Sequence, residues 1–106
     1  MLKVFISQPM NGKSQNQIES DRMIATSDAI MQVSNDFGVE VGKIKIINSV
    51  LKDYAPKSSP LLYLGESIKM MADADVVYFF NGWENAHGCL IEHECAKKYG
   101  KRVIYF

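Results

Sequence analysis

Glu92 is the carboxylate best placed to do chemistry in this chain. It lies in the stretch N81-G-W-E-N-A-H-G-C-L-I-E-H-E-C-A96, shortly after Gly88, where a helix is expected to begin. The positive end of a helix favours an ionised carboxylate, so we expect Glu92 to stay ionised. At the mouth of a crevice, such a group can act as a nucleophile or hold a sugar hydroxyl. On the pattern alone, the simpler explanation is that Glu92 stabilises the helix start.

A second polar stretch, S7-Q-P-M-N-G-K13, precedes another expected helix. It offers backbone N–H groups, a hydroxyl, two amides and a lysine, which can together seat a phosphate or a sugar. An ordinary strand-to-helix turn explains the same residues equally well. The stretch has neither the Walker spacing nor the G-x-G-x-x-G pattern, so the sequence does not support ATP or dinucleotide binding. No cofactor is expected.

Trp83 is unusual in an otherwise polar loop. It could stack on a nucleobase or fill a subunit interface, and the sequence does not choose between them. Cys89 and His93 lie four residues apart near His87 and Cys95, which superficially resembles a zinc cluster. Because no C-x-x-C is present and Cys95 falls off the shared face, we predict no metal site. We expect both cysteines to be reduced thiols.

The rest of the sequence predicts the elements that hold these loops. We expect strands at residues 2–7, 43–47, 76–80 and 102–106, and helices at 14–37, 61–74 and 89–99. Ser14 and Gly38 suit the two ends of the first helix. Residues 53–60, rich in proline and serine, fit no regular element. The first helix has an apolar side of Ile18, Ala25, Ala29 and Val33, with Met23, Ile24, Ile30 and Met31 beside it, and a polar face of Glu19, Arg22, Asp28 and Asn35.

This alternation predicts an α/β fold with a parallel four-stranded sheet between helices, formed by a single domain of residues 1–106. Right-handed crossovers favour the strand order 2-1-3-4, with the apolar strand 76–80 at the centre. Strands one and three would then open a crevice at their carboxyl ends, lined by the two polar stretches above. Asp73 and Asp75 would lie at the opposite edge, where we expect structural capping.

Composition narrows the classes of function. Twelve basic and twelve acidic residues give a formal net charge of zero, and no basic cluster favours a nucleic-acid polymer or a membrane surface. The longest apolar stretch, residues 76–80, is far too short to span a bilayer. No secretory signal is evident at the N-terminus, so cytoplasm is the expected compartment.

Both ends of the chain resemble a known family. The strand A74-D-V-V-Y-F79 followed by G88-x-x-x-E92-x-x-x-A96 resembles the nucleoside 2-deoxyribosyltransferase superfamily, which includes nucleoside 5′-monophosphate N-glycosidases. The opening V4-F-I-S-Q-P-M-N-G12 and the closing G82–A96 stretch are similar to its small, often phage-encoded DUF4406-type branch. The resemblance implies a flavodoxin-like three-layer sandwich and a homodimer or higher homo-oligomer.

The resemblance also implies a reaction. The matching glutamate, Glu92, would attack C1′ of the sugar, the base would leave, and a second base or water would resolve the glycosyl-enzyme ester. Glu66, beside the family's helper-acid position at Ser67, is assigned the second catalytic role. Substrate contacts are expected from Ser7, Gln8, Pro9, Met10, Asn11, Gly12, Trp83, Asn85, His87 and Gly88.

Some positions depart from the family pattern. Ser67 replaces the helper acid, and Ala86 replaces a polar ligand six residues before the glutamate. The chain ends at the fourth expected strand, where typical members continue to a fifth, so a site residue from that extension would come from a partner. These departures keep a second hypothesis open, a nucleotide-binding module without turnover. A third hypothesis is an interaction subunit without a ligand, in which Trp83 and the proline-rich loop at residues 53–60 face a partner.

Overall fold

The computed structural model of the chain describes residues 1–47 and 59–106. Within them, four strands alternate with three α-helices, as the sequence predicts. The elements in chain order are β1 (Leu2–Ser7), α1 (Gln15–Phe37), the 3-10 helix η1 (Val41–Lys43), β2 (Ile44–Ile46), α2 (Pro60–Met71), β3 (Val76–Phe79), the 3-10 helix η3 (Trp83–Asn85), α3 (His87–Lys98) and β4 (Arg102–Tyr105).

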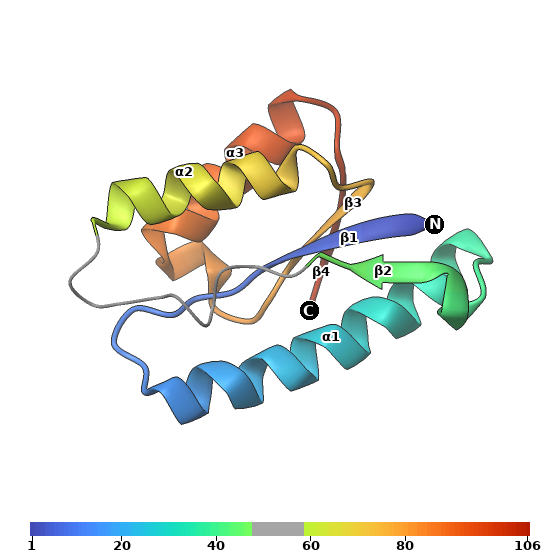
Figure 1. Cartoon of the computed structure of the whole chain (residues 1–106), viewed down its shortest axis with the longest axis horizontal. Helices are drawn as coiled ribbons and strands as arrows, with labels where there is room; N and C mark the ends of the chain where they lie inside the picture. Colours follow the sequence, from blue (N-terminus) through green and yellow to red (C-terminus); the bar gives the residue numbers. More distant parts are fainter. Residues whose placement is uncertain (48–58) are drawn as a thin grey trace.

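The sheet is parallel throughout, and its strands lie in the order β2-β1-β3-β4 (Figure 1), which confirms the predicted order. All four residues of β3 are buried, as expected of a central strand. Ser7 and Phe79 are register partners at the carboxyl ends of β1 and β3. The segments that follow these strands therefore leave the sheet side by side at one edge.

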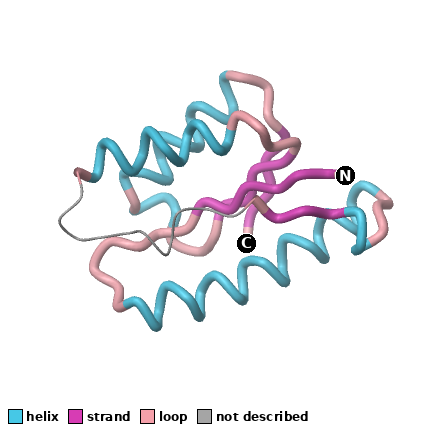
Figure 2. Tube along the Cα trace, viewed as in Figure 1, coloured by secondary structure: helices cyan, strands magenta, loops and turns pink. Residues whose placement is uncertain are grey.

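The helices form two layers, with α1 on one face of the sheet and α2 and α3 on the other (Figures 1 and 2), so the predicted three-layer α/β fold is confirmed. Side chains alternate between the faces along each strand, and each face has its own apolar core. On the α1 face the buried core is Val4, Ile6, Ala25, Ala29, Val33, Ile44, Val76, Tyr78, Phe80 and Ile104. On the other face it is Phe5, Met71, Ala74, Val77, Phe79 and Ala96.

Helix α1 begins and ends as predicted. The Ser14 side chain accepts a hydrogen bond from Gln17 N, and Gly38 adopts the left-handed conformation, with φ of 64°, that closes many helices. Its sides differ from the prediction, because Met23, Ile24 and Met31 are exposed. The expected polar face is instead half-buried at Arg22 and Asp28.

Among the described residues, no helix is long and apolar enough to cross a membrane.

Two helices begin earlier than predicted. Helix α2 begins at Pro60, a residue well suited to a first helical position because its missing N–H has no partner there in any case. Helix α3 begins at His87 rather than at residue 89. The edge strand β2 occupies only part of the predicted strand 43–47. Most of the irregular stretch predicted at 53–60 lies outside the described residues.

The two aspartates at the amino edge of the sheet are structural, as predicted. Asp75 accepts a hydrogen bond from the backbone N–H of Lys3 at 2.8 Å, and Asp73 pairs with the Lys3 ammonium at 2.9 Å. They tie the start of β1 to the segment that leads into β3. The carboxyl edge of the sheet is therefore the one that carries unassigned polar side chains.

The packing of α1 on the sheet predicts a cost for added volume. Ala29 is fully buried against the strands, so Ala29→Leu is expected to lower the free energy of unfolding by about 1–3 kcal/mol. The same leucine at the exposed position Asn35 should change it by less than about 0.5 kcal/mol. Urea denaturation measures both, and an equal effect at the two positions would contradict this packing.

Candidate functional site

A small cavity lies at the carboxyl edge of the sheet, where β1 ends. Its volume is about 20 Å³. Four segments contribute to it: the end of β1 with the loop after it, and the helices α1, α2 and α3. The lining residues are Phe5, Ile6, Ser7, Gln8, Met10, Arg22, Tyr63, Ser67 and Glu92.

Ser7 and Glu92 meet directly inside this cavity. The Ser7 hydroxyl donates a hydrogen bond of 2.7 Å to Glu92 Oε1, and both residues are buried, with exposed fractions of 1% and 6%. Ser7 is the last residue of β1, while Glu92 lies 85 residues later on α3. The structure thus brings together the two polar stretches that the sequence places at the crevice.

The charge state of Glu92 differs from the expectation. Since α3 begins at His87, Glu92 lies in the second turn, where the helix dipole is weak. Burial dominates and raises the pKa of Glu92 to about 7, although the Ser7 hydrogen bond favours the ionised form. The prediction that Glu92 stays ionised was therefore wrong. Near neutral pH both the protonated and the ionised form of Glu92 are present, which suits a group that takes up and releases a proton.

The first loop is fastened to α1 by its own side chains. Gln8 Nε2 donates to the carbonyl oxygen of Ile18 at 3.1 Å, and Lys13 pairs with the buried Asp21 at 2.7 Å. Gly12 has a φ of 79°, a conformation that suits a residue without a Cβ. The Lys13 ammonium is thus committed to a structural ion pair, while Gln8 remains at the cavity wall.

Arg22 is a cavity residue that the sequence analysis missed. Its guanidinium donates to the carbonyl oxygens of Ile6 and Ile47, at 3.4 and 3.1 Å, and burial lowers its pKa. Arg22 makes no ion pair within residues 1–47 and 59–106. Its spacing of four from the buried Ile18 was the available signal, because residues four apart share a helix face.

Helix α2 contributes Tyr63 and Ser67, which are also four residues apart. Neither was predicted as a site residue, although Ser67 holds the position where the resemblance places a helper acid. The neighbouring Glu66, our candidate for that role, is exposed and lies 4.0 Å from Lys69. The structure therefore does not bring Glu66 to the cavity. Of the described acidic residues, Glu92 alone lines it.

The other predicted contact residues do not line the cavity. Pro9 lies near the second loop, since a Cβ added at Gly82 would lie 3.6 Å from Pro9 Cγ. Gly88 is close to α2, where an added Cβ would lie 3.9 Å from Leu64 Cδ1. The side chains of Asn11, Asn85 and His87 are exposed, as is Gly12. Of the predicted contacts, the cavity itself includes Ser7, Gln8 and Met10.

Trp83 belongs to an aromatic cluster at the carboxyl edge. Its indole stacks on His93, with ring centroids 4.3 Å apart, and also contacts Phe79 and Tyr105. His93 Nε2 lies 2.8 Å from the Tyr105 hydroxyl. These contacts give Trp83 a packing role within the chain, and its side chain does not line the Glu92 cavity.

The cysteines do not form a reactive centre here. Both are free thiols, and burial raises the pKa of Cys89 to about 11, which keeps it protonated at neutral pH. A protonated thiol is a poor nucleophile and a poor metal ligand. Over the described residues, no three His, Cys, Asp or Glu side chains gather closely enough to hold a metal ion.

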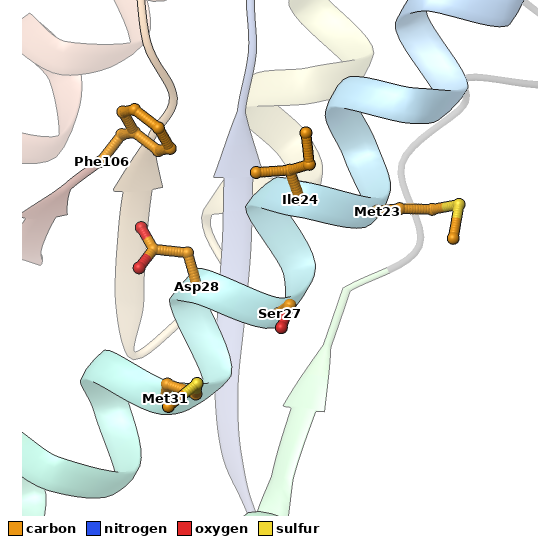
Figure 3. Close-up of a pocket in the computed structure, with 6 residues that line it drawn as sticks. All are labelled: Met23, Ile24, Ser27, Asp28, Met31 and Phe106. Atoms are coloured by element: carbon orange, nitrogen blue, oxygen red, sulfur yellow. The ribbon is translucent and has the colours of Figure 1, made fainter.

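A larger hollow of about 520 Å³ lies elsewhere, on the outer side of α1 beside the C-terminus. Figure 3 shows Met23, Ile24 and Met31 along α1, with Phe106 beyond the end of β4. The carboxylate that lines this hollow, Asp28, already accepts a hydrogen bond of 2.6 Å from the Tyr78 hydroxyl. The hollow therefore has apolar area but lacks the converging polar groups of a catalytic site.

The Glu92 cavity has room for one water or one hydroxyl group. A sugar could enter only if lining side chains moved. The half-buried ones are Met10, Arg22 and Tyr63, and the Tyr63 hydroxyl lies 3.8 Å from the Met10 sulfur. The thioether is flexible and readily repacked. Once opened there, the cavity would present a carboxylate, a hydroxyl, an amide and a guanidinium to a ligand.

Comparison with known protein families gives a match over nearly the whole chain. A family model described as "Domain of unknown function (DUF4406)" matches residues 2–105. No curated protein and no solved structure matches the chain. The matched residues run from the first residue of β1 to the last of β4, and so include both loops of the candidate site.

The buried carboxyl group predicts a dependence of stability on pH. The pKa of Glu92 rises from 4.5 to about 7, so between these pH values the unfolded chain has lost a proton that the folded chain keeps. This contribution therefore lowers stability as the pH rises, by about 3 kcal/mol in total. Glu92→Gln removes it, so the variant should gain that amount relative to the wild type between pH 4.5 and pH 8.

Urea denaturation of both proteins across this pH range measures the effect. Glu94→Gln, an exposed change on the same helix, is the matched control and should differ from the wild type by a constant amount. A stability difference between Glu92→Gln and the wild type that does not vary with pH would show that Glu92 titrates normally.

Proposed function

The chain belongs to the DUF4406 family, and from this premise we propose that it is a cytoplasmic N-glycosidase or deoxyribosyltransferase acting on a nucleoside or nucleoside 5′-monophosphate. The observation that carries the proposal is the hydrogen bond of 2.7 Å between Ser7 and Glu92 in a cavity at the carboxyl edge of the sheet. Ligands of open α/β sheets bind at this edge, between strands whose following helices lie on opposite faces.

In the proposed reaction, ionised Glu92 attacks C1′ of the sugar. A C1′–O bond forms, the C1′–N bond breaks, and its electron pair leaves with the base, which takes a proton. Attack by water or by a second base at C1′ then breaks the ester and restores the carboxylate. Ser7 would hold the Glu92 side chain in place and help to stabilise its charged form.

Proton delivery to the base has no second carboxyl group at the cavity wall among the described residues. A second carboxyl group is usual in this chemistry, but Glu66 is exposed and Ser67 lines the cavity instead. The hydroxyl groups of Ser67 and Tyr63 are the neutral donors at the wall, with water as the alternative. We therefore expect slow turnover, fastest with bases that leave easily.

Arg22 supports a substrate with a negative charge. It is half-buried, lines the cavity and has no carboxylate partner among the described residues. A guanidinium binds phosphate in a bidentate manner, so a 5′-phosphate is a suitable partner for it. This favours the monophosphate over the free nucleoside.

A nucleotide-binding module without turnover is the second candidate. The observations that favour it are the serine at position 67 and a cavity that holds no more than a hydroxyl group. In that case the same ligands would stabilise the protein without being cleaved.

The homodimer or higher homo-oligomer implied by the family resemblance remains part of the proposal.

The enzyme hypothesis predicts release of free base from at least one member of a panel of ribo- and deoxyribonucleosides and their 5′-monophosphates. Because the nucleophile is the ionised form, the rate should increase with pH through about 7. Glu92→Gln should lower the rate by about a thousandfold or more. Chromatography of the released base, with labelled base added to detect exchange, measures both.

Glu94→Gln is again the matched control and should keep the wild-type rate. Ligand-induced increases in melting temperature without any base release would favour the binding module instead. If no compound of the panel is cleaved or exchanged by the intact oligomer, the enzyme hypothesis fails.

A further inference from the structure

Gln8 carries a buried oxygen for which the described chain supplies no hydrogen-bond donor. The side chain is 6% exposed, and its Oε1 atom accepts no hydrogen bond from residues 1–47 or 59–106. Buried polar atoms are nearly always paired, so an unpaired acceptor requires an explanation. The residue lies directly after Ser7 and lines the same cavity as Glu92.

The orientation of the Gln8 amide is fixed by its other end. Its Nε2 atom donates to the carbonyl oxygen of Ile18 at 3.1 Å. Rotating the amide by half a turn would place Oε1 against that carbonyl oxygen, and two acceptors repel each other. The polar atom of Gln8 that lacks any partner among the described residues is therefore an acceptor, and its partner must be a donor.

This requirement separates the two ligand groups that the first loop could hold. A phosphate group at neutral pH presents acceptor oxygens and negative charge, which Oε1 would repel. A sugar hydroxyl can donate, and the cavity of about 20 Å³ has room for one such group beside Glu92. If Glu92 attacks C1′, the ligand groups nearest to the carboxylate belong to the sugar ring.

We propose that Gln8 is a specificity-determining residue whose Oε1 accepts a hydrogen bond from a ring hydroxyl of the bound sugar, so that the site selects ligands that carry this hydroxyl. The inference rests on the proposed function for its ligand class. A ligand without the hydroxyl leaves the buried acceptor unpaired, and sites of this kind discriminate strongly.

The free protein offers a distinctive test of this role. Gln8→Met keeps the length of the side chain and removes the unpaired acceptor. The Ile18 carbonyl keeps its partner within α1, the backbone N–H four residues later. A purely structural glutamine would lose stability on this change, whereas Gln8→Met is expected to leave the melting temperature unchanged or raise it.

The experiment measures, by calorimetry, the affinity of wild type and Gln8→Met for four nucleosides and their 5′-monophosphates with one base: ribo, 2′-deoxy, 3′-deoxy and 2′,3′-dideoxy. The wild type should bind at least one hydroxyl-bearing form about tenfold or more tightly than the dideoxy form. Gln8→Met should erase this preference while binding the dideoxy form as the wild type does. Gln15→Met, at an exposed position, should retain the preference.

Each outcome decides the inference. Equal affinity of the wild type for hydroxyl-bearing and dideoxy ligands overturns it, as does a preference that survives in Gln8→Met, or no binding at all. A large fall in the melting temperature of Gln8→Met also counts against it. Hydroxyl-dependent binding without base release would remove the proposed catalysis and leave this inference standing, while base release that is indifferent to Gln8 would do the reverse.

Discussion

A carboxyl group that is almost completely removed from water is the constraint on which this site depends. Glu92 is 6% exposed, so bulk water solvates its charge only weakly. The Ser7 hydroxyl replaces part of that solvation at 2.7 Å. The contact requires β1 to end beside α3, which in turn requires β1 and β3 to be neighbours in a parallel sheet. Strand order, helix placement and the protonation of Glu92 are thus linked by one interaction.

The cavity differs from the rest of the described chain in how it treats polar groups. Elsewhere, some charges have direct partners, as Lys3 does with Asp73 and Lys13 with Asp21. Around the cavity, burial raises the pKa of the Glu92 carboxyl group, and within the described residues the Arg22 guanidinium has no acidic partner and Gln8 Oε1 has no donor. Proteins tolerate such local conflicts mainly where function requires them. Their concentration in one place supports a ligand site independently of the family resemblance.

Much of the fold could be predicted from the sequence, because strand order follows from the alternation of elements and from crossover handedness, and the ends of α1 follow from Ser14 and Gly38. The site was predicted less completely. Burial is a tertiary property, so the pattern around Glu92 could not reveal that its pKa rises. The sequence analysis placed Arg22 on the polar face of the first helix. Which part of that helix faces the cavity depends on how α1 packs against the carboxyl edge of the sheet, which the helical pattern does not show. Glu66 and Ser67 are neighbours on α2, and successive side chains of a helix point about 100° apart. The cavity is therefore lined by Ser67 and not by Glu66.

Ser7, the last residue of β1, and Gln8, the residue after it, affect how this site could diverge. Successive side chains of an extended segment point in opposite directions, and here Ser7 reaches α3 while Gln8 reaches α1. The two halves of the cavity are therefore built by different layers that share only the backbone of one strand. Substitutions on α1 could retune recognition while α3 keeps its chemistry, and the converse holds equally. Such modular separation would let related chains change ligands without rebuilding the scaffold.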